Sequence, residues 1–566
     1  MVDTTPHLPP VVGKFVGVAE NATGPVPAEN LFSLTEHCGY EHCGYELGNG
    51  NEGAMGRILL STLNARYSHT SFGLRCLRAA MGDLRTETDL AEFTINDSLD
   101  TVLADIVFRR PQILGLGVYI WNVEPITSLL RDLVRLLPET IVILGGPELS
   151  GLSESGEHSE LAELADFIIT GEADHAFREL CEQLLRGVRP EQKIRHAGAA
   201  DLRSLPLPYA EYTSRDLAER TVYVELSRGC PFTCEFCLSA LDIPVRTYPL
   251  NDFLAAMEDL LARGLRQFKF VDRTFNLNLR LSESVLRFFL SRLTPDLFLH
   301  FEMIPDRLPE SLRQLLAEFP AGVVQLEIGI QTFSEQVGEL ISRRMDSAAT
   351  ERNLRWLQEH SQVHLHTDLI AGLPGETMET FISGFDRLYR LHPQEIQIGI
   401  LKRLKGTPLL RHEQTHKLLW SSRAPFEILS TSDMSWEELQ EIRLFARFWD
   451  LFANSGNFTS SLPLLLRHES PWHDLNQFFQ WVSEQEQRRH GIALIRLAER
   501  LFEYLTKICG QPAEDCARVI WSDYTRSGRR DRPAFLREFD LPSPGRPTAE
   551  RLLPARQRRH AADAES

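Results

Sequence analysis

The stretch TVYVELSRGCPFTCEFC (residues 221–237) is the most informative part of the sequence, because it joins a strand pattern to three closely spaced cysteines. Cys230, Cys234 and Cys237 have a C-x3-C-x2-C spacing that directly follows the apolar run. Three such thiolates can hold three irons of a 4Fe–4S cluster and leave the fourth iron open to a small molecule. A structural zinc ion would need a fourth ligand at sensible spacing, and a disulfide would leave one thiol over. The spacing therefore predicts an iron–sulfur cluster in a loop that follows a strand.

Downstream of the cysteines, apolar strand patterns alternate with helical patterns. Strands are expected at residues 221–229, 266–275, 297–304, 323–331, 364–374 and 395–404. Six strand–helix units are two fewer than a complete eightfold barrel has. Residues 215–420 are therefore expected to form a partial (β/α)6 TIM-type barrel, with its functional face at the C-terminal ends of the strands.

Upstream of the cysteines, residues 57–190 show the same alternation, in strand runs such as PQILGLGVYIW and TIVILGG. Apolar runs separated by amphipathic helices indicate a parallel sheet that is covered on both faces. We therefore expect an α/β, doubly wound (Rossmann-like) domain whose ligand lies at the C-terminal ends of the strands. Residues 191–214 contain several prolines and alanines and are expected to be a linker.

The two ends of the chain differ from its centre. Residues 425–525 have apolar side chains at three- and four-residue spacing, which predicts a helical domain, and residues 526–566 are predicted to be a frayed Arg/Pro-rich tail. Residues 1–56 are predicted to be a disordered extension that carries the tandem pentapeptide EHCGY–EHCGY. That repeat is either a short duplication, the favoured interpretation, or a metal clip made of His37, Cys38, His42 and Cys43.

Composition excludes several classes of protein. The chain has 566 residues, of which 43% are apolar and 24% charged, and its net charge is −18. Such an acidic protein is a poor non-specific binder of nucleic acid or anionic lipid. No apolar run is long enough for a membrane helix, and no secretory signal is visible, so a cytoplasmic protein is expected. The nine cysteines are unevenly placed, which favours a metal or catalytic use for some of them.

The cysteine motif, with Phe236 before its last cysteine, resembles that of the radical S-adenosylmethionine (SAM) superfamily. The resemblance covers residues 215–420 and implies that SAM chelates the open iron. An electron from an external donor of the flavodoxin or ferredoxin type would then cleave SAM to methionine and a 5′-deoxyadenosyl radical. The matching strand ends are KFVDRTFN, LEIGIQT and TDLIAGLPGET, each of which could also be an ordinary barrel strand. The SAM-binding candidates are Phe236, Asp272, Thr274, Glu302, Glu327, Gln331, Ile370 and Gly372.

The N-terminal domain resembles the cobalamin-binding domain that precedes the barrel in one branch of this superfamily. The candidate cobalamin contacts lie at strand ends and turns: Ser61, Thr62, Tyr119, Gly145, Gly146, Pro147, Gly171 and Glu172. The Asp-x-His-x-x-Gly motif that supplies a histidine to cobalt in some cobalamin domains is absent, because His69 lies four residues before Gly73. Either His69 is an unusual ligand, or cobalt has no protein histidine below it, which is the favoured interpretation. The domain could also bind another ligand or none.

The C-terminal domain resembles an extension of unknown function in the same branch. The leading hypothesis is a cobalamin-dependent radical SAM enzyme that methylates an unactivated carbon of an unknown small-molecule or peptide substrate. The alternatives are a radical rearrangement or cyclisation without methyl transfer, and a non-catalytic redox protein. A tRNA-modifying methylthiotransferase is set aside, because it would need three more cluster cysteines and only Cys76 and Cys181 lie in the folded N-terminal part.

Overall fold

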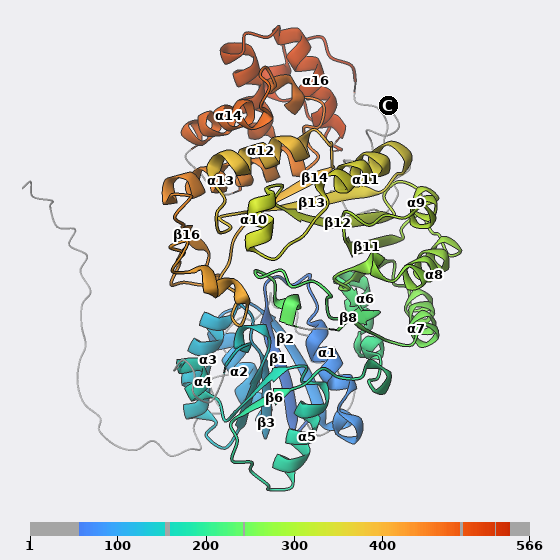
Figure 1. The fold of residues 1–566 in the computed structure, drawn as a ribbon, viewed down its shortest axis with the longest axis vertical. Helices are drawn as coiled ribbons and strands as arrows, with labels where there is room; N and C mark the ends of the chain where they lie inside the picture. The colour runs from blue at the N-terminus through green and yellow to red at the C-terminus, as the bar shows by residue number, and fades with distance from the viewer. Residues whose placement is uncertain (1–55, 153–158, 242–243, 487–490, 527, 544–566) are drawn as a thin grey trace, which may run out of the picture. The chain divides into compact units, whose positions relative to one another are not determined.

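The computed structural model describes residues 56–152, 159–241, 244–486, 491–526 and 528–543. The tandem EHCGY repeat, with its candidate ligands His37, Cys38, His42 and Cys43, lies outside the described residues. Residues 55–566 form one compact unit, whose parts are coloured from blue to red along the chain in Figure 1.

The N-terminal domain is built on a six-stranded parallel sheet in the order β2-β1-β3-β4-β5-β6, so the predicted doubly wound fold is confirmed. The central strand β1 is buried along its whole length, which explains its run of apolar residues. The strand order reverses between β1 and β3, and this reversal places a crevice at their C-terminal ends. The strands are β1 (Ile58–Asn64), β2 (Thr88–Thr94), β3 (Ile113–Gly117), β4 (Ile141–Gly145), β5 (Phe167–Gly171) and β6 (Ile194–Ala197).

Helices cover this sheet with apolar faces of the predicted period. In α3, the buried residues Ile126, Leu129, Leu130 and Leu133 lie on one face. The helices are α1 (Phe72–Ala79), α2 (Leu99–Arg109), α3 (Val123–Leu136), α4 (Glu160–Leu164) and α5 (Asp174–Leu185). β6 corrects the predicted linker 191–214, because Ile194–Ala197 pairs in parallel with β5.

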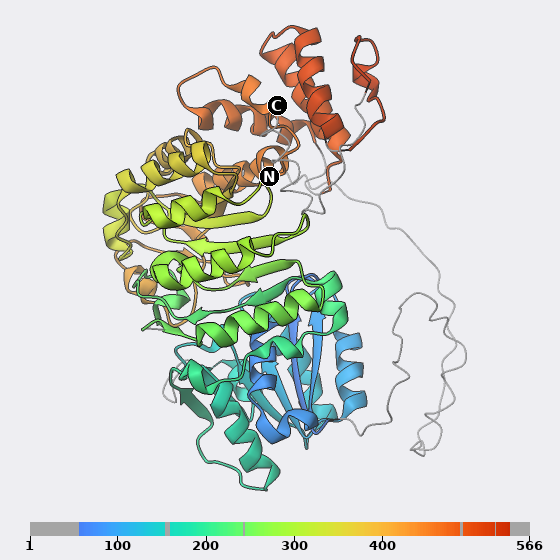
Figure 2. The same cartoon turned by 90° about the vertical axis from the view of Figure 1, so that its right-hand side faces the viewer.

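The second sheet is the predicted partial barrel, with six parallel strands in the order β14-β13-β12-β11-β10-β7. Figure 2 shows its helices along one side of the strands. The strands are β7 (Val222–Val224), β10 (Gln267–Phe270), β11 (Phe298–Met303), β12 (Val324–Gln331), β13 (His364–Ala371) and β14 (Glu395–Ile400). The helices before and between them are α6 (Ser214–Glu219), α7 (Leu250–Ala262), α8 (Leu279–Leu290), α9 (Glu310–Ala317), α10 (Glu335–Leu340), α11 (Ser347–His360) and α12 (Met378–Tyr389).

Two short hairpins extend the barrel. The antiparallel pair β8 (Ser227–Arg228) and β9 (Arg246–Thr247) closes the base of the cysteine-bearing segment. The pair β15 (Leu419–Trp420) and β16 (Ile428–Ser430) follows the last barrel strand.

The C-terminal domain is helical, as expected, and contains α13 (Trp436–Trp449), α14 (Pro471–Gln485), α15 (Leu494–Glu503) and α16 (Ala513–Arg526). A capping box of Ser435 and Glu438 begins α13. Where α13 ends in a π-helical turn, Asn454 accepts a hydrogen bond from the backbone N–H of Ile396 in β14 and donates to its carbonyl, both at 3.0 Å. The side-chain amide of Asn454 thus pairs with the last strand in the barrel order as a neighbouring strand would.

The predicted Arg/Pro-rich tail is packed over part of its length. Leu536 is fully buried, the rings of Phe535 and Phe539 contact Phe502, and Trp521 donates its ring N–H to the carbonyl of Pro542. Apolar residues among the arginines therefore dock this segment onto α15 and α16. None of the described helices is both long and apolar enough to cross a lipid bilayer.

Candidate active site

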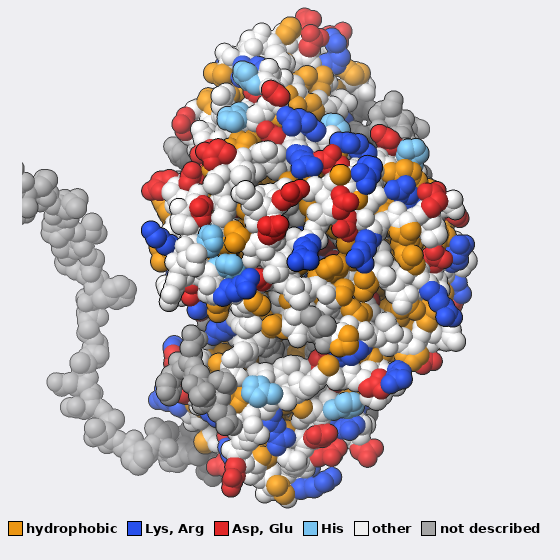
Figure 3. Space-filling model, viewed as in Figure 1, with side chains coloured by type: hydrophobic (Ala, Val, Ile, Leu, Met, Phe, Trp, Pro, Cys, Tyr) orange, Lys and Arg blue, Asp and Glu red, His pale blue; other side chains and the backbone are white. Residues whose placement is uncertain are grey.

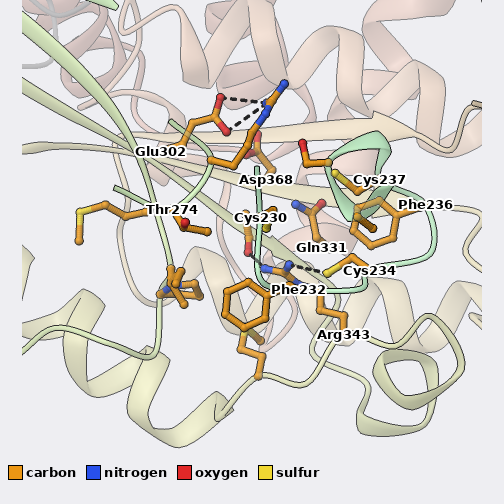
Figure 4. A pocket seen from close by; sticks show the side chains of 18 of the residues that line it. Cys230, Phe232, Cys234, Phe236, Cys237, Thr274, Glu302, Gln331, Arg343 and Asp368 are labelled. Carbon is orange, nitrogen blue, oxygen red and sulfur yellow. Dashed lines mark hydrogen bonds and ion pairs between the residues drawn. The ribbon is translucent and has the colours of Figure 1, made fainter. Parts of the chain in front are cut away.

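The three cysteines of the cluster loop, defined here as residues 229–241, line one cavity at the C-terminal ends of the barrel strands (Figure 4). Cys234 is buried, Cys230 and Cys237 are half-buried, and all three thiols are free. Burial raises the pKa of Cys230. Within the described ranges, no three His, Cys, Asp or Glu side chains converge on a single ion. This arrangement fits a 4Fe–4S cluster, in which each thiolate binds a different iron, better than zinc, whose ligands surround one point.

The inward-facing side chains of four strands form the rest of the cavity. In β12, Glu327, Gly329 and Gln331 alternate with buried residues that face the helices. The same alternation brings Glu302 from β11 and Asp368 from β13 to the cavity, and Thr274 reaches it from the turn after β10. The sheet pleat therefore selects which residues of each predicted strand can meet a ligand.

Five of the eight SAM-binding candidates line this cavity, and three do not. The five are Phe236, Thr274, Glu302, Glu327 and Gln331.

Asp272 instead holds the chain that leads to the cluster loop. Its buried carboxylate accepts hydrogen bonds from the backbone N–H of Leu226 at 3.0 Å and of Ser227 at 2.6 Å, and from the hydroxyl of Ser227 at 2.6 Å. Burial raises its pKa to about 7.

Ile370 and Gly372 also lie outside the cavity lining. Gly372 has φ +86°, and a Cβ there would lie 2.6 Å from Cγ2 of Ile428 in β16. The missing side chain at this SAM-binding candidate makes room for Ile428 of the C-terminal hairpin.

Gln331 gives the cavity an unsatisfied hydrogen-bond acceptor. Its backbone has φ +71° at an irregularity in β12, and its side chain folds over Gly329, where a Cβ would lie 2.4 Å from Nε2 of Gln331. Its buried Oε1 has no hydrogen-bond partner among the described residues. A buried acceptor without a partner is costly. A ligand that brings a hydroxyl or amine donor would relieve this cost.

Charged side chains fix the ionisation of Glu327 at the cavity floor. Burial alone would raise its pKa, but a hydrogen bond from His300 at 3.0 Å and the charge of Lys269, 4.0 Å away, hold it at about 2. On the neighbouring strand, burial opposes protonation of His366, yet Asp368 and Glu395 raise its pKa to about 10. A carboxylate that lines the cavity thus lies opposite an imidazolium on the neighbouring strand at neutral pH.

The cavity wall carries both signs of charge. Arg273 forms an ion pair with Glu302 at 3.2 Å, and burial raises the pKa of this glutamate. Arg343 donates hydrogen bonds to the carbonyls of Gly329 and Ile330 and lies 3.6 Å from Sγ of Cys234. A cavity lined by both arginines and carboxylates suits a zwitterionic ligand.

Sequence reasoning missed Arg273, Arg343 and Asp368. Asp368 lies two residues before the predicted Ile370, so strand alternation could have placed it on the same face. Arg343 lies in the connection after α10, and no local pattern marks it as a neighbour of the cysteines.

A second cavity lies at the strand ends of the N-terminal domain and contains six of the eight cobalamin candidates: Tyr119, Gly145, Gly146, Pro147, Gly171 and Glu172. Its remaining wall is largely apolar and includes Gly115 and Gly117. Gly117 would place a Cβ 3.3 Å from the ring of Tyr119, and Gly145 would meet only the carbonyl of Ile169, at 3.6 Å. Absent side chains at the reversal of strand order leave room for a large cofactor to insert, so the residues fit cobalamin.

Ser61 and Thr62 do not reach this cavity, because both are fully buried within the sheet. The Thr62 hydroxyl donates to the carbonyl of Gly117 at 2.7 Å and accepts from Asn122 at 3.1 Å. Thr62 therefore ties β1 to β3 where the two strands diverge.

His69 is likewise absent from the lining of this cavity. Its Nδ1 lies 2.5 Å from the hydroxyl of Tyr223 in β7, and its backbone bridges to Thr221. Burial and the nearby Lys269 lower its pKa. The side chain is thus engaged at the start of the barrel, on the chain that leads to the cluster loop.

Glu172 links the second cavity to the cluster loop. Its carboxylate accepts hydrogen bonds from Arg246 at 2.5 and 2.9 Å and from Arg228 at 3.2 Å. These arginines are register partners in the β8–β9 hairpin, from which the cluster loop extends. Arg228 also pairs with Asp174 and Glu225, both at 3.0 Å. The expected cobalamin contact is therefore engaged in ion pairs with the base of the cluster loop.

Family comparisons agree with this arrangement of domains. A model of the radical SAM superfamily matches residues 224–388, and a B12 binding domain model matches residues 58–181. The chain therefore contains a radical SAM domain preceded by a B12-binding domain, and this pair implies a 4Fe–4S cluster, SAM and cobalamin as cofactors. Residues 414–550 match a protein of unknown function, DUF4080, so the chain is a B12-binding radical SAM protein with this third domain.

Solved structures share the fold. OxsB, a cobalamin-dependent SAM radical enzyme solved with aqua-cobalamin and SAM bound, superposes with a TM-score of 0.57 over 90% of this chain and 79% of its own, at 12% identity. TsrM from Kitasatospora setae is a radical SAM methyltransferase solved with cobalamin and a 4Fe–4S cluster. It superposes with a TM-score of 0.52 over 65% of this chain and 78% of its own, at 17% identity.

Curated relatives match part of the chain. The ribosomal protein uS12 methylthiotransferase RimO of Pelobacter propionicus is 28% identical over 194 residues, which are 33% of this chain and 43% of the relative. That of Geobacter sulfurreducens is 26% identical over 263 residues, 44% of this chain and 56% of the relative. The chain thus spans about half the length of these relatives.

Proposed function

We propose that this chain uses SAM, a 4Fe–4S cluster and cobalamin to methylate an unactivated carbon of its substrate. The observation that carries the proposal is the pair of cavities, one lined by three free cysteines and one by strand-end glycines. The second cavity is also lined by Arg228 of the β8–β9 hairpin, from which the cluster loop extends. When bound, the cluster and SAM supply a carbon radical that abstracts hydrogen, and cobalamin supplies the methyl group.

The protein side chains place and orient these groups. Cys230, Cys234 and Cys237 hold the cluster, and an external donor of the flavodoxin or ferredoxin type supplies the electron. Gln331 Oε1 orients SAM by accepting a hydrogen bond, and the arginines and carboxylates of the cavity bind its charged methionine end.

On the face shown in Figure 3, acidic and basic side chains are intermingled, so the net negative charge is not gathered there.

A second candidate is methylthiotransferase chemistry, which the similarity to RimO favours. The described part of the N-terminal domain contains two cysteines, Cys76 and Cys181, fewer than a second cluster of three thiolates would need. Both thiols are buried, and burial raises the pKa of Cys181 to about 12, so it stays neutral. The cysteine content therefore supports methyl transfer over methylthiolation.

Product mass separates these outcomes. Methylation adds one CH2 unit to the substrate, methylthiolation adds CH2S, and a rearrangement or cyclisation adds no carbon. A non-catalytic redox protein would bind the cofactors and release no 5′-deoxyadenosine from SAM under a strong reductant.

The test begins with full-length protein purified without oxygen, with its cluster rebuilt. We expect one cobalamin per chain, absorbance near ~400 nm from thiolate-bound iron, and 5′-deoxyadenosine release from SAM. Cys234→Ala should abolish the absorbance and the release, whereas Cys181→Ala, at a buried thiol outside both proposed ligand sets, should keep both. Retained SAM cleavage in Cys234→Ala would overturn the proposal.

A further inference from the structure

The cluster loop carries a buried acidic side chain that the proposed function leaves unexplained. Glu235 lies between Cys234 and Phe236 and is 3% exposed. A buried carboxylate needs ion-pair or hydrogen-bond partners, because an isolated charge is very costly to remove from water. The origin of these partners shows which parts of the chain hold the loop.

The first partners come from the segment after α10. The backbone N–H of Glu235 donates to the carbonyl of Ile341 at 3.0 Å, and the Ser342 hydroxyl donates to Oε1 of Glu235 at 2.6 Å. The next residue, Arg343, contacts Cys234. Ser342 has φ +55°, a left-handed conformation that is strained for a non-glycine residue. Three consecutive residues thus face the loop around a strained backbone position.

The second partners come from the turn Pro408–His412, which follows the last barrel strand. The N–H of Leu409 donates to the carbonyl of Glu235 at 3.1 Å. Arg411 forms an ion pair with Oε1 of Glu235, and His412 Nε2 lies 2.9 Å from Oε2. This turn falls between the residues matched by the radical SAM model and those matched by the DUF4080 model.

We propose that Glu235 is a positioning residue that joins these two segments and fixes the cluster loop in the geometry that the three thiolates need. The turn Pro408–His412 is then a functional part of the cluster site, although it lies outside the matched barrel. This inference rests on the proposed function, because it assumes that the three cysteines bind a 4Fe–4S cluster.

The experiment compares cluster retention in full-length variants whose clusters have been rebuilt without oxygen. Glu235→Gln keeps the shape of the side chain and removes its charge, and Arg411→Ala removes a partner from the other side. Loss of a group that supports metal ligands costs about 10- to 100-fold in metal affinity. We therefore expect both variants to lose iron to a chelator at least tenfold faster than the wild type, with a broadened electron paramagnetic resonance signal from the reduced cluster.

Two variants keep the test specific. Arg403→Gln breaks the 3.1 Å ion pair with Glu413 beside the same turn without touching Glu235, so it should retain iron as the wild type does. Arg411→Lys restores the charge and should recover part of the loss, even if Glu235→Gln folds poorly.

Each outcome bears on the inference. The inference would be overturned if Glu235→Gln lost iron at the wild-type rate with an unchanged resonance signal. It would also be overturned if Arg403→Gln lost iron as fast as Glu235→Gln. The proposed function fails separately, if Cys234→Ala keeps the cluster.

Discussion

Replacing Glu172 with Gln should loosen the base of the cluster loop, because this carboxylate binds both strands of the β8–β9 hairpin. Arg228 and Arg246 donate to it from opposite positions of the hairpin, and the Glu172 side chain is 14% exposed, so water screens the contacts little. Glutamine keeps the shape, but its amide group places N–H donors against the N–H donors of the guanidinium groups.

The size of the effect follows from the partners that remain. Removing one member of a buried ion-paired network costs about 3–5 kcal/mol. Arg228 keeps Asp174 and Glu225, so we take the lower end, about 3 kcal/mol. Because 1.4 kcal/mol is a tenfold change, local opening of the hairpin should become about 100-fold more frequent.

Hydrogen exchange measured by mass spectrometry reads this opening directly, on peptides that cover residues 226–228 and 246–248. A matched control is Glu211→Gln, which removes a more deeply buried carboxylate that binds Arg78 at 2.5 Å and Arg85 at 2.7 Å and does not contact the hairpin. Unchanged exchange in Glu172→Gln, or an equal rise in both variants, would refute the reasoning.

Three further changes test other parts of the structure. Burial raises the pKa of Glu376 to about 8 from an ordinary 4.5, so its contribution to stability is present below about pH 4.5 and is lost as the pH rises through 8. In urea unfolding, the free energy of unfolding of the wild type should fall by about 3 kcal/mol more than that of Glu376→Gln between about pH 6 and 9. An equal fall in both proteins would contradict this assignment. His69→Ala should leave cobalamin affinity unchanged, since the imidazole binds Tyr223. A tenfold loss of cobalamin affinity in a binding titration would show that His69 is a ligand. Gly372→Ala should cost about 2–5 kcal/mol in chemical denaturation, from its positive φ and the contact with Ile428. Ile428→Leu should recover part of that cost, and no recovery would exclude the contact as its source.

Most strands were predictable from the sequence because each has a pattern that burial imposes. β1 begins with an apolar run and is buried throughout, since both its faces are covered, and β12 alternates because one face lines the cavity. β6 was missed because the sequence IRHA is short, half-exposed and largely polar. A strand at the edge of a sheet needs little apolar surface, so its pattern resembles that of a linker.

The candidate site was predictable where one segment contains its own signal. The cysteine spacing and the inward positions of β12 are local, so both were found. Arg343 and Arg411 are brought to the cluster loop by the chain segments after α10 and β14, which no local periodicity specifies. The motif positions of Asp272 and Gly372 predict SAM contacts, and no local pattern predicts their contacts with the backbone of Ser227 and the side chain of Ile428.

The pairing of Asn454 with β14 affects how a domain deletion would be interpreted. An uncovered edge strand offers its backbone groups to other chains and promotes aggregation. A chain that stops before α13 would present β14, with the free N–H and carbonyl of Ile396, to a second copy of itself. Lost activity in such a deletion would then reflect self-association, and a charged substitution on β14 would be needed before a catalytic role could be assigned to the removed helices.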